Sequence, residues 1–491
     1  MRKKIGVVGA GVGGLAVAAR LGSAGFDVEV YEKLGRCGGR NNIVEDAGFK
    51  FDTGPSFVLM PDFFEEVFVS CGRRLSDYLD LAVLDPSYKI FYADGECLTV
   101  HRDASRTKEE LEKFEPGAAA GYDGFLAETS RIYRHLQPML YKRFGPQALL
   151  DPRYWLLVNK IRALSSYWGL ARKYFKSEKL CYAFTFEAMF IGVSPFHSPA
   201  FYSIISYADH VQKIFHPMGG MYRIPLALEK LARETGARIF YDSPVEKIEK
   251  HNGSVQLAFK DAARKPQVRA FDQVVVNADY VYAQNSLLGR RPRRYEYSCS
   301  VYLLYLGLKR KAPSCFAHHN LFFAQDLRRN LKEIFTTGTI PEDPSFYVHV
   351  PTVTDASLAP AGKEIFYVLV PVPNLQGGRQ DLSAGQEARL RSTVFAGIHK
   401  ATGFDTEQEI EVEHRFYPQD FIKKYNIAEA ATFGLAHTLG QSAFFRPAND
   451  DSRVSGLYYV GASTQPGGGL PVVLASSRIT ADLIRDREGR A

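Results

Sequence analysis

Two glycine-rich segments near opposite ends of the 491-residue chain constrain its fold more than any other feature. Residues 9–14 read Gly-Ala-Gly-Val-Gly-Gly, and residues 461–471 read Gly-Ala-Ser-Thr-Gln-Pro-Gly-Gly-Gly-Leu-Pro. Each segment follows an apolar, strand-like run and precedes a helix-like run. A helix that begins there presents unpaired N–H groups and the positive end of its dipole to an electron-rich ligand. If both segments hold the same ligand, that ligand is long and the fold returns to its start.

The first segment carries a dinucleotide-binding pattern. Residues 4–32 predict a strand, a glycine turn, a helix and a second strand, which form one βαβ unit of a parallel sheet. In the G-x-G-x-x-G spacing, Gly9 allows the tight turn, Gly11 admits a pyrophosphate to the backbone and Gly14 lets the helix pack on the strand. Glu32 ends the second strand, where a carboxylate binds ribose hydroxyls and repels a 2′-phosphate. The pattern predicts NAD or FAD; the alternative is a glycine turn without a ligand.

Composition and cysteine spacing disfavour several other kinds of site. Hydrophobic residues make up 46% and charged residues 23% of the chain, which is ordinary for a globular protein with a large core. The six cysteines are scattered without C-x-x-C spacing, and there is no H-E-x-x-H motif. We therefore expect a reducing compartment and no metal site. The adjacent His318 and His319 are interpreted as surface residues rather than metal ligands.

The remaining pattern predicts a helical middle and a second sheet. Residues 105–230 lack clear strand alternation and predict mainly helices, whereas strands return in residues 236–278 with a hairpin at Asn252-Gly253. Further strands are expected in the segments 296–308, 345–350 and 364–370, which suggest a second, more antiparallel sheet.

The residues that follow the first βαβ unit resemble a known group of flavoproteins. Gly38-Gly39-Arg40 and Phe51-Asp52-Thr53-Gly54-Pro55 resemble the superfamily of amine oxidases, protoporphyrinogen oxidases and carotenoid desaturases. Residues 456–470 resemble the signature of the bacterial-type phytoene dehydrogenases, although Gln465 stands where histidine is commoner, which puts acid–base work by a histidine there in doubt. The resemblance implies FAD as the cofactor. The predicted cofactor-binding residues are Gly9, Gly11, Gly14, Glu32, Gly39, Arg40, Gly54, Pro55, Val245, Gly461, Ala462, Gly469, Leu470 and Pro471.

This resemblance also implies the fold class. We expect an α/β protein with a Rossmann-like FAD-binding domain, a mixed-sheet substrate domain and a helical membrane-facing region, interleaved along the chain. The predicted FAD-binding domain comprises residues 1–80, 225–290 and 440–491. The substrate-binding domain comprises residues 81–110 and 291–439, and the helical region comprises residues 111–224.

The implied reaction is the desaturation of a linear isoprenoid hydrocarbon in carotenoid biosynthesis, by hydride transfer to flavin N5. Six segments look most similar to the thirty-carbon branch of the family, which implies 4,4′-diapophytoene (dehydrosqualene) as substrate and diaponeurosporene or diapolycopene as product; they are residues 58–62, 190–195, 219–222, 297–300, 348–351 and 471–474. A quinone or oxygen is expected to reoxidise the flavin. The alternatives are a forty-carbon phytoene desaturase, a carotenoid terminal oxidase, a soluble flavin amine oxidase and a non-catalytic flavin-binding protein.

Two residues are candidates for the proton step of that reaction. Asp151 and Arg153 lie in a region where an acid and a base are proposed for relatives, so we carry them as catalytic candidates. The alternative is a turn or a surface ion pair around Pro152.

One stretch predicts contact with a membrane. Residues 142–179 hold nine Lys and Arg residues and two acidic residues, and their net charge of +7 equals that of the whole chain. Both tryptophans, Trp155 and Trp168, lie there. Basic, aromatic, helix-prone segments are typical of proteins that lie on an anionic bilayer. We expect a peripheral protein on the cytoplasmic face of the membrane and no nucleic-acid partner; a solvated helical face is the alternative.

Overall fold

A parallel sheet lies at the centre of the half of the molecule that holds both glycine-rich segments. The computed structural model describes residues 2–145 and 151–489. Its five-stranded parallel sheet has the order β19-β13-β1-β2-β9, with bounds β1 Lys4–Val8, β2 Asp27–Tyr31, β9 Arg238–Phe240, β13 Gln273–Val276 and β19 Leu457–Tyr459. Val7 pairs with Val30 on one side and Val275 on the other. These strands are apolar runs because both faces of a parallel sheet are covered.

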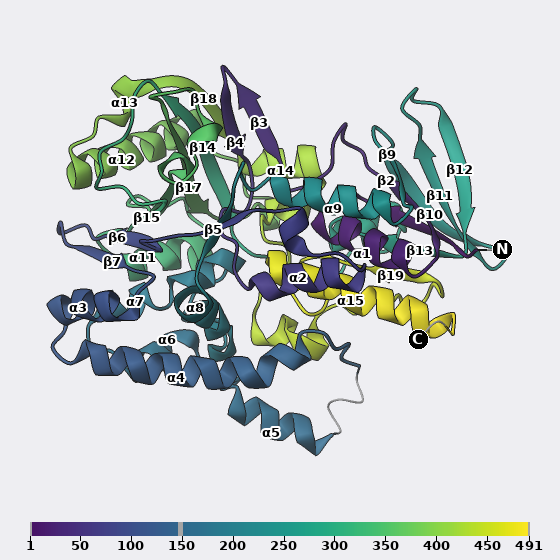
Figure 1. Ribbon diagram of the computed structural model, residues 1–491, viewed down its shortest axis with the longest axis horizontal. Helices are drawn as coiled ribbons and strands as arrows, with labels where there is room; N and C mark the ends of the chain where they lie inside the picture. Colours follow the sequence, from purple (N-terminus) through teal and green to yellow (C-terminus); the bar gives the residue numbers. More distant parts are fainter. Residues whose placement is uncertain (1, 146–150, 490–491) are drawn as a thin grey trace.

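Different elements cover the two faces of this sheet (Figure 1). Helices cover one face, namely α1 (Val12–Ser23), α9 (Arg223–Glu234) and α15 (Leu470–Arg487), with α2 (Pro61–Ser70) packed against α15. The antiparallel strands β10 (Val245–His251), β11 (Ser254–Lys260) and β12 (Pro266–Phe271) pack on the other face. The β10–β11 connection is Asn252-Gly253, so the predicted hairpin is confirmed.

The second sheet is mixed, as expected. Its order is β18-β14-β17-β16-β15-β6-β7, and every pair is antiparallel except β15 with β6. The bounds are β6 Tyr88–Phe91, β7 Cys97–Val100, β14 Ser300–Leu308, β15 His319–Phe322, β16 Phe346–His349, β17 Glu364–Val372 and β18 Ile410–Phe416. Helix α12 (Ala384–Thr402) buries Leu390, Val394 and Ile398 in the core on one face of this sheet.

The helical region lies along the lower edge of Figure 1, below the second sheet. It contains α3 (Ala104–Phe114), α4 (Ala118–Leu136), α5 (Pro152–Lys160), α6 (Tyr167–Arg172), α7 (Glu178–Ala183) and α8 (Ile204–Tyr207). Within the described residues, no helix is both long enough and apolar enough to cross a bilayer. The domain boundaries predicted from the sequence stay a prediction.

Short elements complete the fold. The strand pairs are β3 (Ile43–Asp46) with β4 (Phe49–Asp52), and β5 (Leu81–Val83) with β8 (Phe215–Pro217). The remaining α-helices are α10 (Tyr280–Tyr282), α11 (Leu327–Lys332), α13 (Thr406–Glu409) and α14 (Pro418–Tyr425), and short 3-10 and π turns join many of the elements.

The prediction that His318 and His319 lie on the surface is wrong. Their exposed fractions are 2% and 0%. His319 begins β15, which lies between β16 and β6 inside the second sheet, so neighbouring strands and packed loops cover both rings. The two rings do point to different partners, since His318 bonds to Thr354 and His319 bonds to Tyr347.

Candidate active site

A single large cavity connects the two sheets. Its volume is about 1060 Å³, and its walls come from the parallel sheet, the second sheet and the helical region. The cavity brings together all of the predicted cofactor-binding residues except Gly14; they are Gly9, Gly11, Glu32, Gly39, Arg40, Gly54, Pro55, Val245, Gly461, Ala462, Gly469, Leu470 and Pro471. Segments from both ends of the chain therefore line one space.

Helix α1 begins at this cavity on glycines where a larger residue would be strained or would clash. Gly9 has a φ of +99°, and a Cβ on Gly14 would lie 2.1 Å from the carbonyl oxygen of Gly9. Gly14 thus serves the packing of the helix on the strand rather than the cavity wall. The N-cap Gly11 offers no side chain to the first N–H groups of the helix, so an anionic ligand can take them.

Glu32 lies at the end of β2, beside the start of α1. Its Oε2 accepts a hydrogen bond from Ala10 N at 2.7 Å, and its Oε1 accepts one from Leu34 N at 2.9 Å. Burial raises the pKa of this carboxyl group, and the backbone N–H groups of Leu34 and Ala10 oppose that rise. These bonds hold the carboxyl group at the cavity wall, where the hydroxyls of a ribose would meet it.

Arg40 supplies positive charge to the same end of the cavity. Its guanidinium donates to the carbonyl oxygen of Thr432 at 2.7 Å. Within the described ranges, Arg40 forms no ion pair, although the charge of Asp279 opposes the fall in pKa that burial causes. A guanidinium with spare donors beside the α1 N-terminus suits a pyrophosphate.

The second glycine-rich segment leads into α15, whose first turn lies beside that of α1: a Cβ on Gly13 would lie 2.9 Å from Val473 Cγ1. The N-cap Gly469 has a φ of +102° and no side-chain cap, and a Cβ there would meet no atom within 4 Å. The Gly468 N–H donates to His437 Nε2 at 2.9 Å, which fixes the loop just before the helix. The open N-terminus of α15 therefore faces the cavity, as a site for the electron-rich edge of a flavin requires.

A buried arginine that the sequence did not single out holds this loop. Arg446 is 2% exposed and donates to the carbonyl oxygens of Leu435, Ala436, Gln441, Ala462 and Thr464. Burial lowers its pKa to about 10, so it stays charged at neutral pH. Neither Arg446 nor His437 belongs to a recognisable motif, because their partners are backbone groups brought together by the fold.

Gln465, the departure from the family signature, has a structural contact. Its side-chain amide accepts from Phe144 N at 2.8 Å and donates to Phe144 O at 3.0 Å. Gln465 does not line the cavity, so this position ties the segment before residue 146 to the C-terminal loop.

The rest of the cavity is apolar. Away from the dinucleotide end, its walls are mainly aliphatic and aromatic and include Phe57, Phe186, Phe190, Leu303 and Phe323. Among the described lining residues there, Arg162 is the only charged one, and its guanidinium is paired with Glu128 at 2.8 Å.

The proposed proton-step residues lie elsewhere. Asp151 caps the start of α5 by accepting a hydrogen bond from Arg153 N at 2.9 Å, and the two side chains form an ion pair. The side chain of Arg153 is 88% exposed, and neither residue lines the cavity. This is the surface ion pair around Pro152 that the sequence left as the alternative.

Comparisons with known proteins show sequence similarity to flavin-dependent oxidoreductases and carotenoid desaturases. A family model described as flavin containing amine oxidoreductase matches residues 12–485. A zeta-carotene-forming phytoene desaturase from Myxococcus xanthus is 42% identical over 98% of this chain and 93% of that protein. A 4,4′-diapophytoene desaturase (4,4′-diaponeurosporene-forming) from Staphylococcus aureus (strain MRSA252) is 34% identical over 99% of both chains.

Solved structures share the fold at low sequence identity. An oxidoreductase from Methanosarcina mazei gives a TM-score of 0.61 at 17% identity, covering 98% of this chain and 100% of its own. Putrescine oxidase bound to putrescine gives a TM-score of 0.61 at 16% identity, with 100% of both chains covered.

The chain therefore belongs to the flavin-containing amine oxidoreductase family, and its cofactor is FAD. Within that family it groups with the carotenoid desaturases, and it is an FAD-dependent oxidoreductase that acts on CH–CH groups.

Proposed function

We propose that this enzyme desaturates a linear isoprenoid hydrocarbon in carotenoid biosynthesis. The observation that carries the proposal is the continuity of one cavity, which runs from the dinucleotide end into an apolar, aromatic-lined space. A soluble amine oxidase would need polar groups to hold an amine. Among the described residues that line the apolar part, the one charged residue, Arg162, is already paired with Glu128. The apolar walls suit a hydrocarbon.

Bound FAD supplies the hydride acceptor. The chain's own residues prepare the site for this cofactor and its substrate in three ways. The N-terminus of α15 favours negative charge at the ligand edge that faces it. The buried Arg446 holds the loop at a constant position, and the apolar walls exclude water from the hydrocarbon.

The proposal also specifies the number of carbons in the substrate. We favour the thirty-carbon substrate 4,4′-diapophytoene, on the sequence segments that resemble that branch and on the Staphylococcus aureus relative that carries this name. A forty-carbon phytoene is the second candidate, because the Myxococcus xanthus relative is a phytoene desaturase and is 42% identical.

Pigment formation tests both parts. The chain is co-expressed with a thirty-carbon or a forty-carbon synthase, and the extracted pigments are separated and identified by their absorption spectra. We expect coloured products with the thirty-carbon synthase. Colour only with the forty-carbon synthase would overturn the chain length, and colour with neither would overturn the desaturase function.

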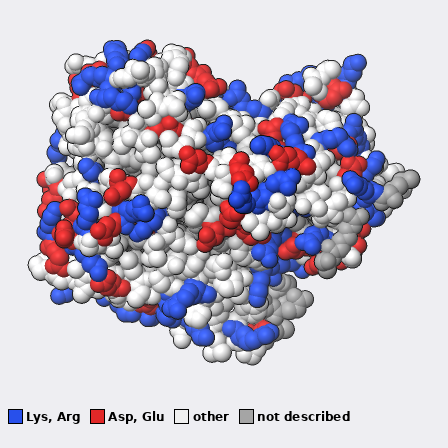
Figure 2. Space-filling model, viewed as in Figure 1, with Lys and Arg blue, Asp and Glu red and all other residues white. Residues whose placement is uncertain are grey.

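We also propose that the enzyme takes its substrate from an anionic membrane through α5 and the loop after it. Trp155, Leu156 and Leu164 are 62%, 66% and 81% exposed, and Trp155 and Leu164 also line the cavity. Because Trp155 and Leu164 are exposed to solvent and also line the cavity, they support an opening of the cavity to the surface beside α5. Figure 2 shows blue and white surface with little red on the lobe that holds α5. Residues 146–150 of the predicted segment 142–179 lie outside the described residues.

Vesicle flotation tests this surface. A triple variant, Trp155→Ser with Leu156→Ser and Leu164→Ser, should lose most of its binding to phosphatidylcholine vesicles that contain phosphatidylglycerol. The matched control is Val268→Ser on β12, since Val268 is 64% exposed but distant from α5. Equal flotation of the triple variant and the control would contradict the proposal. The same proposal places the enzyme on the cytoplasmic face of the membrane. It also makes a membrane quinone or oxygen the acceptor of electrons from the reduced flavin.

A further inference from the structure

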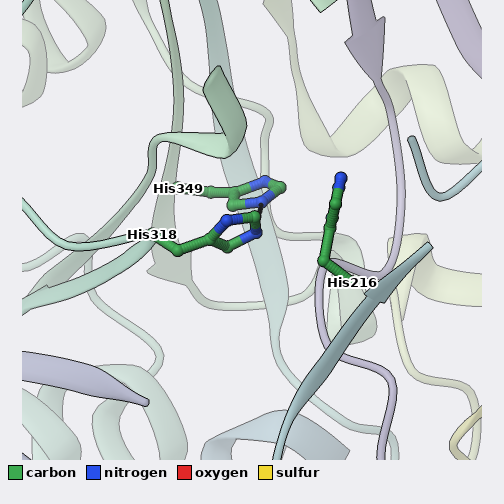
Figure 3. A group of neighbouring side chains, drawn as sticks. All are labelled: His216, His318 and His349. Atoms are coloured by element: carbon green, nitrogen blue, oxygen red, sulfur yellow. Dashed lines mark hydrogen bonds between the residues drawn. The ribbon is translucent and has the colours of Figure 1, made fainter. Parts of the chain in front are cut away.

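Three buried histidines from separate parts of the chain converge beside the second sheet (Figure 3). His216 belongs to β8, His318 precedes β15, and His349 ends β16. One ring nitrogen from each lies within 4.8 Å of the others, and the Nε2 atoms of His318 and His349 are 2.9 Å apart. None of the three lines the flavin and substrate cavity. They form a separate site, which we call the three-histidine cluster.

The cluster contains polar atoms that the protein leaves unsatisfied. The side chain of His216 is 0% exposed, and neither Nδ1 nor Nε2 has a hydrogen-bond partner among the described residues. A buried donor or acceptor without a partner costs about 1–3 kcal/mol. Such atoms are uncommon in folded proteins and call for a bound partner.

The donor set of the cluster suits a metal. His216, His318 and His349 each offer one imidazole nitrogen to a common space. Three imidazoles are a donor set that binds Zn²⁺ and other divalent transition metals.

Nearby groups would orient the ligands and balance the charge of a cation. Asp355 Oδ2 lies 3.7 Å from His216 Nε2, and Thr354 Oγ1 lies 2.8 Å from His318 Nδ1. Hydroxyl and carboxylate partners of this kind orient metal-bound imidazoles. Burial and the charge of Asp355 raise the pKa of the neighbouring Asp52 to about 7. In residues 2–145 and 151–489, neither aspartate forms an ion pair with a lysine or arginine.

We propose that His216, His318 and His349 bind one divalent transition-metal ion, with Zn²⁺ as the expected occupant. Zinc–imidazole bonds of about 2.0–2.1 Å place tetrahedral ligand nitrogens roughly 3.3 Å apart. The His318–His349 pair needs to open by a few tenths of an ångström and His216 to move closer. The ion would link β8 to strands β15 and β16. Sequence spacing did not reveal the site because its ligands are far apart along the chain.

Metal analysis of the purified protein tests the proposal. The holoenzyme is prepared without a histidine tag or chelator, and its metal content is measured by mass spectrometry. We expect about one zinc per chain in the wild type and almost none in His216→Ala or His349→Ala. The matched control is His319→Gln, since His319 is equally buried and packs on the His349 ring, but its Nδ1 bonds to Tyr347 and it is not one of the three converging ligands. That variant should keep the metal.

X-ray absorption at the zinc edge provides a measurement that needs no variant. The wild type should show a nitrogen shell at about 2.0 Å with scattering from three imidazoles. A wild type that holds no metal and takes up none on dialysis against zinc, cobalt or copper would overturn the proposal. So would a bound zinc without imidazole scattering, or equal loss of metal from the His319→Gln variant. If the His216 and His349 variants fail to fold, the wild-type spectrum alone decides.

Discussion

At the scale of single residues, the absence of a Cβ on Gly14 lets helix α1 pack against the turn at Gly9, beside the cofactor site. A Cβ at this position would lie 2.1 Å from a backbone oxygen, which cannot move without breaking the turn at Gly9. We predict that Gly14→Ala loses most of its bound FAD and unfolds several degrees lower, as flavin absorbance and thermal melting would show. Gly385→Ala on α12 is the control, because a Cβ there meets nothing within 4 Å. Normal flavin content in Gly14→Ala would contradict the assignment.

Arg446 carries a second prediction at this scale. Replacement by methionine keeps much of the volume but leaves buried carbonyl oxygens without donors, including those of Ala462 and Thr464. We expect the free energy of unfolding to fall by about 3–5 kcal/mol, as for other buried charged networks, and FAD to dissociate more readily. Urea unfolding and flavin retention on gel filtration measure both effects. Arg453→Met, at an exposed arginine, should change neither.

The sequence predicted cofactor residues where the chemistry depends on local spacing. Gly9, Gly11 and Glu32 form one βαβ unit, so their pattern is visible within a short window. His437 and Arg446 could not be predicted in this way, because they contact backbone groups that only the folded loop brings together. The burial of His319 was missed for a related reason, since the position of β15 inside the sheet is set by long-range strand pairing.

At the scale of elements, the helical region is held together by a buried carboxyl group. Glu187 accepts hydrogen bonds from Tyr167 on α6 at 3.2 Å and from Ser206 on α8 at 3.0 Å. Asp209 and His210 are buried beside it. Burial raises the pKa of Glu187 from 4.5 to about 7, so the folded protein keeps a proton that the unfolded chain has lost.

This shift predicts the direction of a pH dependence. The free energy of unfolding should fall as the pH rises from about 4.5 to 7, by on the order of 1–3 kcal/mol from this group. Glu187→Gln, which cannot ionise, should show a shallower fall, whereas Glu109→Gln on the exposed side of α3 should match the wild type. Urea unfolding at pH 5 and pH 8 measures the difference. An unchanged slope in Glu187→Gln would show that Glu187 is not the group responsible.

Secondary-structure elements could be predicted from the sequence where a single hydrophobic pattern runs through the whole element. The strands β14 and β17 follow the apolar runs expected in residues 296–308 and 364–370. The helical middle was less clear, because its helices other than α3 and α4 are short and their buried faces are set by the packing of α4 against α8 and by the cavity.

At the scale of the whole molecule, the two glycine-rich ends meet because β19 pairs with β13 and β13 pairs with β1. This arrangement places the starts of α1 and α15 on one cavity. The same cavity is also lined by the exposed Trp155 and Leu164, beside which we propose its opening.

The most direct test of the central claim is anaerobic reduction of the bound flavin by its substrate. Enzyme that carries FAD is mixed without oxygen with vesicles that contain 4,4′-diapophytoene or phytoene, and flavin absorbance is followed. We predict that a hydrocarbon bleaches the flavin and that one new carbon–carbon double bond forms for each flavin reduced, while putrescine has no effect. Bleaching by amines alone, or by neither hydrocarbon, would contradict the account.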